Sequence, residues 1–135
     1  MATSTASSTM TLGGLLKHLA FVEEFWCVYM VAGEPRGEPW SSVDWAADPD
    51  WDWNSAKDDA PAELLELWSD SVRRSQAALD AALDDRGLDG FATRSNSEGE
   101  SLSLRWIHVH LIEEYARHNG HADLLREALD GEVGE

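Results

Sequence analysis

Hydrophobic residues recur every three or four positions along three stretches of the chain. This spacing places them on one face of an α-helix, as in helices that pack together in a bundle. Gly33 follows the first stretch, Pro61 opens the second and Gly131 follows the third, and these residue types are common at helix boundaries. The pattern therefore predicts an all-α fold, with helices over about 11–32, 60–86 and 102–129.

The regions outside these helices are polar or irregular. Residues 1–10 are of low complexity, so we expect a disordered N-terminal segment followed by a single helical domain over 11–131. The connection over 33–59 is long for a small domain and contains four of the seven Trp residues. Its acidic residues lack the spacing of a calcium-binding loop, and we interpret them as a solvent-exposed edge: Asp44, Asp48, Asp50 and Asp52.

Ionisable side chains interrupt the apolar face of the last predicted helix. The positions on this face are, in order, Leu104, Ile107, Leu111, Glu114, His118, His121 and Leu125. A buried carboxylate is costly unless another group neutralises it, and a divalent cation would do so. Glutamate and neutral histidine one turn apart are ordinary ligands of first-row metals. This face therefore indicates a metal site.

A third ligand has to come from another helix. His18 is the best candidate, because it lies at the border of the apolar face of the first predicted helix. His110 lies one turn before Glu114, but three ligands from a single helix would form a strained chelate, so we rank it below His18. His108 is interpreted as an ordinary residue on the flank of the helix.

Interpretations without a metal remain open at this stage. A single histidine such as His18 is often a half-buried residue with its own hydrogen bonds. Glu114 can also pair with Arg105 or Arg117. The spacing alone does not choose between these interpretations and a metal site.

The charge and the cysteine content limit which classes of partner the protein can bind and which cellular compartment it occupies. The chain has 10 basic and 26 acidic residues, a formal net charge of -16, which would repel a phosphate backbone, so we expect no nucleic-acid binding. No apolar run approaches the roughly 20 residues that span a bilayer, and no secretory segment opens the chain. Cys27 is the only cysteine, so an internal disulfide is excluded and a cytoplasmic location is expected. We interpret Cys27 as a small apolar residue that fills space beside Trp26.

Two segments resemble a known protein family. They are Leu-Leu-Lys-His-Leu-Ala-Phe-Val-Glu-Glu-Phe-Trp (15–26) and Ser-Leu-Arg-Trp-Ile-His-Val-His-Leu-Ile-Glu-Glu-Tyr-Ala-Arg-His-Asn-Gly-His-Ala-Asp-Leu-Leu-Arg-Glu (103–127). Both are similar to the DinB-like metal-binding bundles, and in particular to an actinobacterial branch related to mycothiol-dependent maleylpyruvate isomerase. The resemblance implies an up-down-down-up helical bundle that holds a divalent metal, commonly zinc or nickel, near one end.

The resemblance also implies roles for individual residues. His18, Glu114 and His118 match the metal ligands of the family, and His121 falls in the layer behind them. In the reaction that the resemblance implies, His121 or Tyr115 would transfer protons.

The tryptophans suggest a pocket. Trp26, Trp40 and Trp45 are candidates for lining it, but for Trp40 and Trp45 we favour the interpretation that they hold an irregular loop against the bundle.

The resemblance raises the question of oligomeric state, because the helix that usually opens these bundles has no counterpart before residue 11. Three helices with strong apolar faces would leave a groove, so we expect a homodimer in which two protomers cover each other's exposed faces.

Two classes of function follow. The first is a metal-dependent transferase or isomerase that uses a low-molecular-weight thiol such as mycothiol, together with a small-molecule substrate. The alternative is a non-catalytic dimeric module that binds a metal or a small ligand.

Overall fold

The computed structural model describes residues 10–134. The disordered segment expected over 1–10 therefore lies, except for Met10, outside the described residues. Helices account for most of the described chain, and residues 10–134 contain no β-strand beyond isolated bridges such as the one between Phe91 and Ser103. The prediction of an all-α fold is confirmed.

The first helical segment carries His18. Helix α1 (Leu12–Glu23) begins after Thr11, whose hydroxyl accepts a hydrogen bond of 2.9 Å from the backbone N–H of Gly14. It continues without a break as the π-helix η1 (Glu24–Val31). Gly33 then adopts a positive φ of 74°, and its left-handed conformation redirects the chain away from the helix.

The long connection after η1 contains short helices of its own. They are η2 (Trp40–Ser42), α2 (Trp51–Asn54) and η3 (Ser55–Asp58). Trp40 is buried here, with 1% of its surface exposed, and α2 packs against α1. The connection is therefore an ordered layer that covers the N-terminal half of α1.

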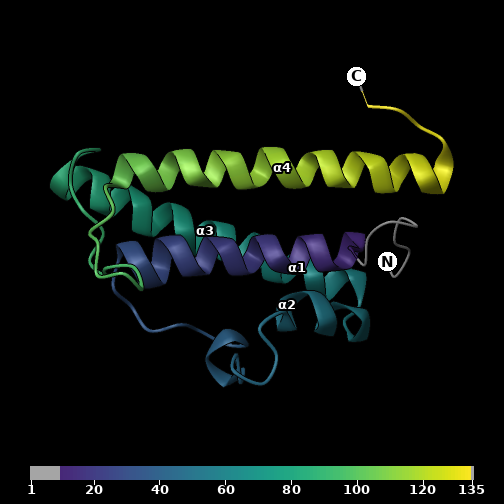
Figure 1. Cartoon of the computed structure of the whole chain (residues 1–135), viewed down its shortest axis with the longest axis horizontal. Helices are drawn as coiled ribbons and strands as arrows, with labels where there is room; N and C mark the ends of the chain where they lie inside the picture. The colour runs from purple at the N-terminus through teal and green to yellow at the C-terminus, as the bar shows by residue number, and fades with distance from the viewer. Residues whose placement is uncertain (1–9, 135) are drawn as a thin grey trace.

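Two long helices complete the fold. Helix α3 spans Pro61–Arg86, and helix α4 spans Leu104–Asp130. Ser103 caps α4 by accepting a hydrogen bond of 3.1 Å from the backbone N–H of Trp106. In Figure 1, α1 and α3 run in the same direction and α4 runs back beside α1.

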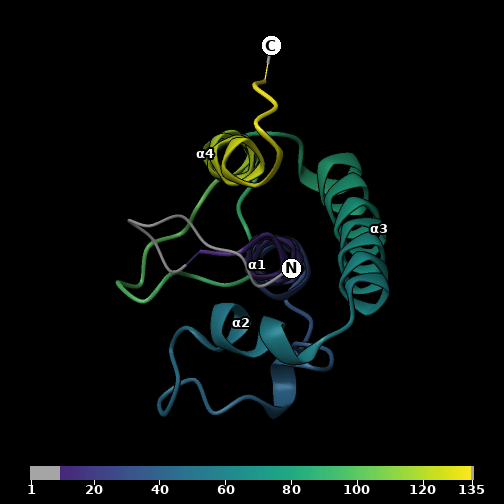
Figure 2. The same cartoon turned by 90° about the vertical axis from the view of Figure 1, so that its right-hand side faces the viewer.

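The helices surround a core centred on η1. Figure 2 shows α1 between α4 on one side and α2 on the other, with α3 along a third side. The buried core residues come from α1, η1, α3 and α4 and from the loop before α4: Val22, Cys27, Val31, Ala82, Ala92, Leu104, Ile107 and Leu111. None of the helices within residues 10–134 combines the length and the apolar character needed to cross a membrane.

Candidate metal centre

Three side chains from two helices converge between α1 and α4. His18 comes from α1, and Glu114 and His118 come from one face of α4. Their ligand atoms lie within 4.8 Å of one another. Oε2 of Glu114 lies 3.6 Å from Nε2 of His18 and 3.2 Å from Nε2 of His118. Two imidazole nitrogens and one carboxylate oxygen gathered in this way form a donor set that suits a divalent first-row metal.

The surroundings of Glu114 bear on the alternative without a metal. Its carboxylate lies near imidazole nitrogens of His18, His110 and His118. Arg105, which the sequence left as a possible partner, instead pairs with Asp89 at 3.1 Å. The groups around Glu114 are therefore imidazoles, which can either bind a metal or donate hydrogen bonds to the carboxylate.

A buried carboxylate lies behind His18. Oδ2 of Asp52, on α2, is 2.7 Å from Nδ1 of His18, and only 4% of the surface of Asp52 is exposed. A carboxylate in this position fixes the ring and keeps the proton on Nδ1, so that the lone pair of Nε2 faces Glu114. The sequence-based interpretation of Asp52 as a solvent-exposed residue is wrong, because α2 folds back over α1.

An indole ring completes the wall on this side. The ring of Trp53 stacks on that of His18, with centroids 4.7 Å apart and planes inclined by 24°. Sequence analysis did not single out Trp53 or Asp52 as site residues. No regular spacing in the sequence separates Asp52 from Asp44, Asp48 and Asp50.

His118 is held in the neutral form. Burial lowers the pKa of His118 below its ordinary value of 6.5, and His18 lowers it further, whereas Glu114 acts in the opposite direction. A neutral imidazole has a free lone pair, which is the form that binds a metal. The environment of His118 therefore favours ligation at neutral pH.

Comparison with known proteins identifies the family. A family profile described as mycothiol-S-transferase (MST) matches residues 1–131. The chain belongs to the mycothiol-S-transferase family. The resemblance to DinB-like, mycothiol-related proteins is thereby confirmed. No curated protein and no solved structure matches the chain.

The other histidines of this family member lie around the cluster. Nδ1 of His121 is 3.2 Å from Nδ1 of His118, which fits the expected place of His121 behind the ligands. Nε2 of His110 is 3.5 Å from Oε1 of Glu114, the oxygen that is not shared by His18 and His118. His108 instead contacts the backbone oxygen of Leu104 through Nδ1, at 2.7 Å.

Tyr115 links three helices of the bundle. Its hydroxyl donates a hydrogen bond of 2.7 Å to Oε1 of Glu23 and accepts one of 3.0 Å from Nε1 of Trp68. Burial raises the pKa of the Tyr115 hydroxyl well above its ordinary value, and the hydrogen bond to Glu23 raises it further. These contacts describe a structural bridge, and proton transfer by Tyr115 stays a prediction.

The tryptophans expected at a pocket occupy two different places. Trp26 contacts His110, with ring centroids 4.8 Å apart, and so lies next to the cluster. Trp40 and Trp45 pack against Phe21, with centroids 5.4 and 4.7 Å away. Their contacts hold the long connection against α1, and a role for these two rings in substrate binding stays a prediction.

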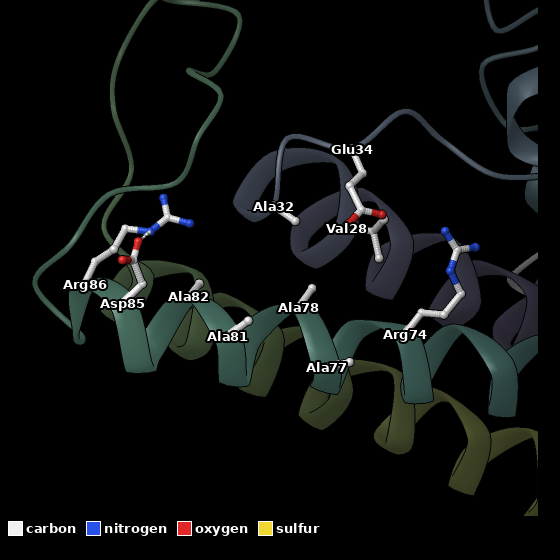
Figure 3. Close-up of a pocket in the computed structure, with 10 residues that line it drawn as sticks. All are labelled: Val28, Ala32, Glu34, Arg74, Ala77, Ala78, Ala81, Ala82, Asp85 and Arg86. Atoms are coloured by element: carbon white, nitrogen blue, oxygen red, sulfur yellow. Dashed lines mark ion pairs between the residues drawn. The ribbon is translucent and has the colours of Figure 1, made fainter.

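Two further features lie outside the candidate metal centre. Burial raises the pKa of the Cys27 thiol to about 12, so it is not a thiolate at neutral pH. A groove of about 510 Å³ lies between η1 and α3. Figure 3 shows alanines along its floor and Arg74 and Arg86 near its ends. None of the residues that line this groove belongs to the His18, Glu114 and His118 cluster.

Proposed function

We propose that this protein is a divalent-metal-dependent transferase that uses a low-molecular-weight thiol, mycothiol in the first instance, as its co-substrate. The observation that carries the proposal is the convergence of His18, Glu114 and His118 in a member of the mycothiol-S-transferase family. An isomerisation that proceeds through a thiol adduct would use the same groups. The reducing compartment expected from a single cysteine suits a thiol co-substrate.

Each residue of the centre has a part in this proposal. His18, Glu114 and His118 would hold the metal, with zinc or nickel as the expected ions. A metal held by three protein ligands supplies Lewis acidity that lowers the pKa of a thiol or water. Asp52 orients the His18 ring, and burial keeps His118 neutral.

Proton transfer falls to the histidines at the edge of the cluster. His110 and His121 each lie against one member of the triad and are partly exposed, so they can exchange protons with water. We assign the uptake of the thiol proton to this pair, with His121 as the first candidate, because it contacts the buried ligand His118.

The thiol reaction can be tested directly. Purified protein is supplied with zinc or nickel, and the consumption of mycothiol is followed with monobromobimane as the electrophile, in which the sulfur displaces bromide. We expect a metal-dependent rate that is lost in His118→Ala and kept in His108→Ala, a histidine of the same helix. If the metal-loaded protein gives no rate above the uncatalysed reaction, while the metal is retained, the non-catalytic binding module becomes the better proposal.

We also propose that two copies of the chain associate through the outer face of α4. This face carries exposed apolar side chains, among them Val109 and Ile112, which are 49% and 68% exposed. Gly120 lies on the same face, with no atom within 4 Å of the position of an added Cβ. Glycine inside a helix costs stability, and a closely approaching second helix would explain its presence.

The molar mass in solution tests this proposal, and we expect a dimer that Ile112→Glu converts into a monomer. Leu65→Glu on α3, at a site that is 51% exposed, is the matched control and should leave the dimer intact.

A further inference from the structure

The candidate metal centre is closed on one side and open on the other. Asp52 and Trp53 of α2 cover the side of His18 that faces the long connection, and the side chain of Asp52 is only 5% exposed. Exposure rises in the opposite direction along α4. The side chains of His118, Glu114 and His110 are 8%, 21% and 25% exposed, and Trp106 is 45% exposed. A ligand can therefore approach Glu114 past His110 and Trp106.

These residues form what we call the aromatic shelf, which consists of Trp26, Trp106 and His110. The rings of Trp106 and His110 are stacked, with centroids 4.9 Å apart and planes inclined by 8°. Trp26 closes the inner edge, with its centroid 5.5 Å from that of Trp106 and 4.8 Å from that of His110. The shelf is continuous with the metal centre, because Nε2 of His110 lies 3.5 Å from Oε1 of Glu114.

The indole ring of Trp106 is the exposed part of the shelf. Aromatic rings prefer offset-stacked or edge-to-face neighbours. Because the rings of the shelf lie in different planes, a ligand ring could contact one ring by stacking and another edge-to-face. A flat ligand can therefore add to the existing stack, whereas a puckered ring of the same size cannot. The formal net charge of -16 disfavours an anionic ligand.

We propose that the aromatic shelf binds the acceptor substrate and that this acceptor is an uncharged molecule with a planar aromatic or conjugated part. The inference rests on the proposed function, since it names the class of molecule that receives the thiol. Stacking on Trp106 would hold the planar part beside His110, with the reactive end directed along α4 towards Glu114. Trp106 is thus a specificity-determining residue at a distance from the ligands of the metal.

Calorimetric titration with an unreactive planar probe tests the proposal. The probe is 1-naphthol, and the comparison compound is decahydro-1-naphthol, which has the same carbon skeleton and hydroxyl group but no planar ring. We expect the wild-type protein to bind 1-naphthol about fivefold more tightly than the saturated alcohol, as expected from one favourable stacking contact. Trp106→Leu should remove this preference, and Trp106→Tyr, which keeps a flat ring, should restore most of it.

Two controls separate this inference from the proposed function. Phe91→Leu removes another exposed aromatic ring, 56% exposed, and should leave the preference for 1-naphthol unchanged. His118→Ala should bind 1-naphthol as the wild type does even when it has lost its metal, because the shelf does not contain this residue. Binding of 1-naphthol without a metal would therefore support the shelf even if the thiol reaction failed.

Three results would overturn the inference. They are no measurable binding of 1-naphthol by the wild-type protein, equal affinity for the planar and saturated alcohols, and an unchanged preference in Trp106→Leu. If Trp106→Leu changed the molar mass in solution, a second copy would cover the shelf, and the inference would also be wrong.

Discussion

Asp52 and His18 are joined by a 2.7 Å contact between a carboxylate oxygen and Nδ1, although 34 positions separate them in the chain. The contact ties the long connection to helix α1 at the point where His18 faces Glu114. A carboxylate behind a metal-binding histidine raises the basicity of the ring and fixes its orientation. The short helix α2 is therefore part of the candidate centre, as well as a cover for α1.

This relationship predicts the effect of changing Asp52. Asp52→Asn keeps the shape of the side chain but removes the charge, so we expect the affinity for zinc or nickel to fall by about 10–100-fold. Competition with a chelator of known affinity measures the change. Asp50→Asn, an exposed aspartate two residues earlier, is the matched control and should bind the metal as the wild type does. Equal affinity in both variants would contradict the role given to Asp52.

The stability of the metal-free protein should depend on pH through His118. The pKa of His118 is lower in the folded protein than its ordinary value of 6.5, so below about pH 6.5 the unfolded chain binds more protons than the folded one. We therefore expect His118 to have no effect on the pH dependence of stability above about pH 6.5. Below this pH, the free energy of unfolding should fall as the pH drops.

Urea unfolding at pH 7.5 and pH 5.5, with a chelator present, measures this effect. His118→Asn should show a smaller loss of stability between the two pH values than the wild type, whereas His108→Asn, on the same helix, should keep the full loss. An identical loss in wild type and His118→Asn would exclude His118 as the source.

The bridge made by Tyr115 predicts a loss of stability. Tyr115→Phe leaves Oε1 of Glu23 and Nε1 of Trp68 without their shared partner, and Glu23 is only 8% exposed. We expect the free energy of unfolding to decrease by about 1–3 kcal/mol in urea titration. Tyr29→Phe is the control, because the contacts of Tyr29 are made by its ring and its backbone oxygen. A stable Tyr115→Phe variant with reduced thiol transfer would instead favour the role in proton transfer.

Cys27 should be unreactive in the folded protein. Its side chain is completely buried, and its pKa of about 12 leaves almost no thiolate at neutral pH. We expect a disulfide reagent such as 5,5′-dithiobis(2-nitrobenzoate) to label the thiol only when the chain unfolds, at a rate that rises with urea concentration. Rapid labelling of the native protein would show that Cys27 is accessible and would contradict its place in the core.

The part of the centre on α4 could be predicted from the sequence, because it depends on one local regularity. Glu114 and His118 share a face of any helix, and Leu111 and Leu125 on the same face indicate that it is buried. His18 could be proposed as a partner because it lies at the border of an apolar face. The distance between the helices, which decides whether His18 reaches Glu114, required the fold.

Asp52 and Trp53 could not be predicted in the same way. Their place depends on how the connection over 32–60 folds back on α1, and no hydrophobic period governs an irregular segment. An aspartate in an acidic loop is exposed in most proteins, and the spacing of Asp44, Asp48, Asp50 and Asp52 gave no reason to separate one of them from the others. The tryptophans were recognised as important for packing, but which of them meets His18 was decided by the path of the chain.

The central claim is that His18, Glu114 and His118 bind one divalent metal, and elemental analysis of the purified full chain tests it most directly. We expect about one zinc or nickel ion per chain in the wild type and in His108→Ala, and almost none in His118→Ala. Circular dichroism of each variant shows that the loss is not caused by unfolding. A wild-type protein that remains free of metal after incubation with zinc and nickel, or a folded His118→Ala that retains the full metal content, would contradict the claim.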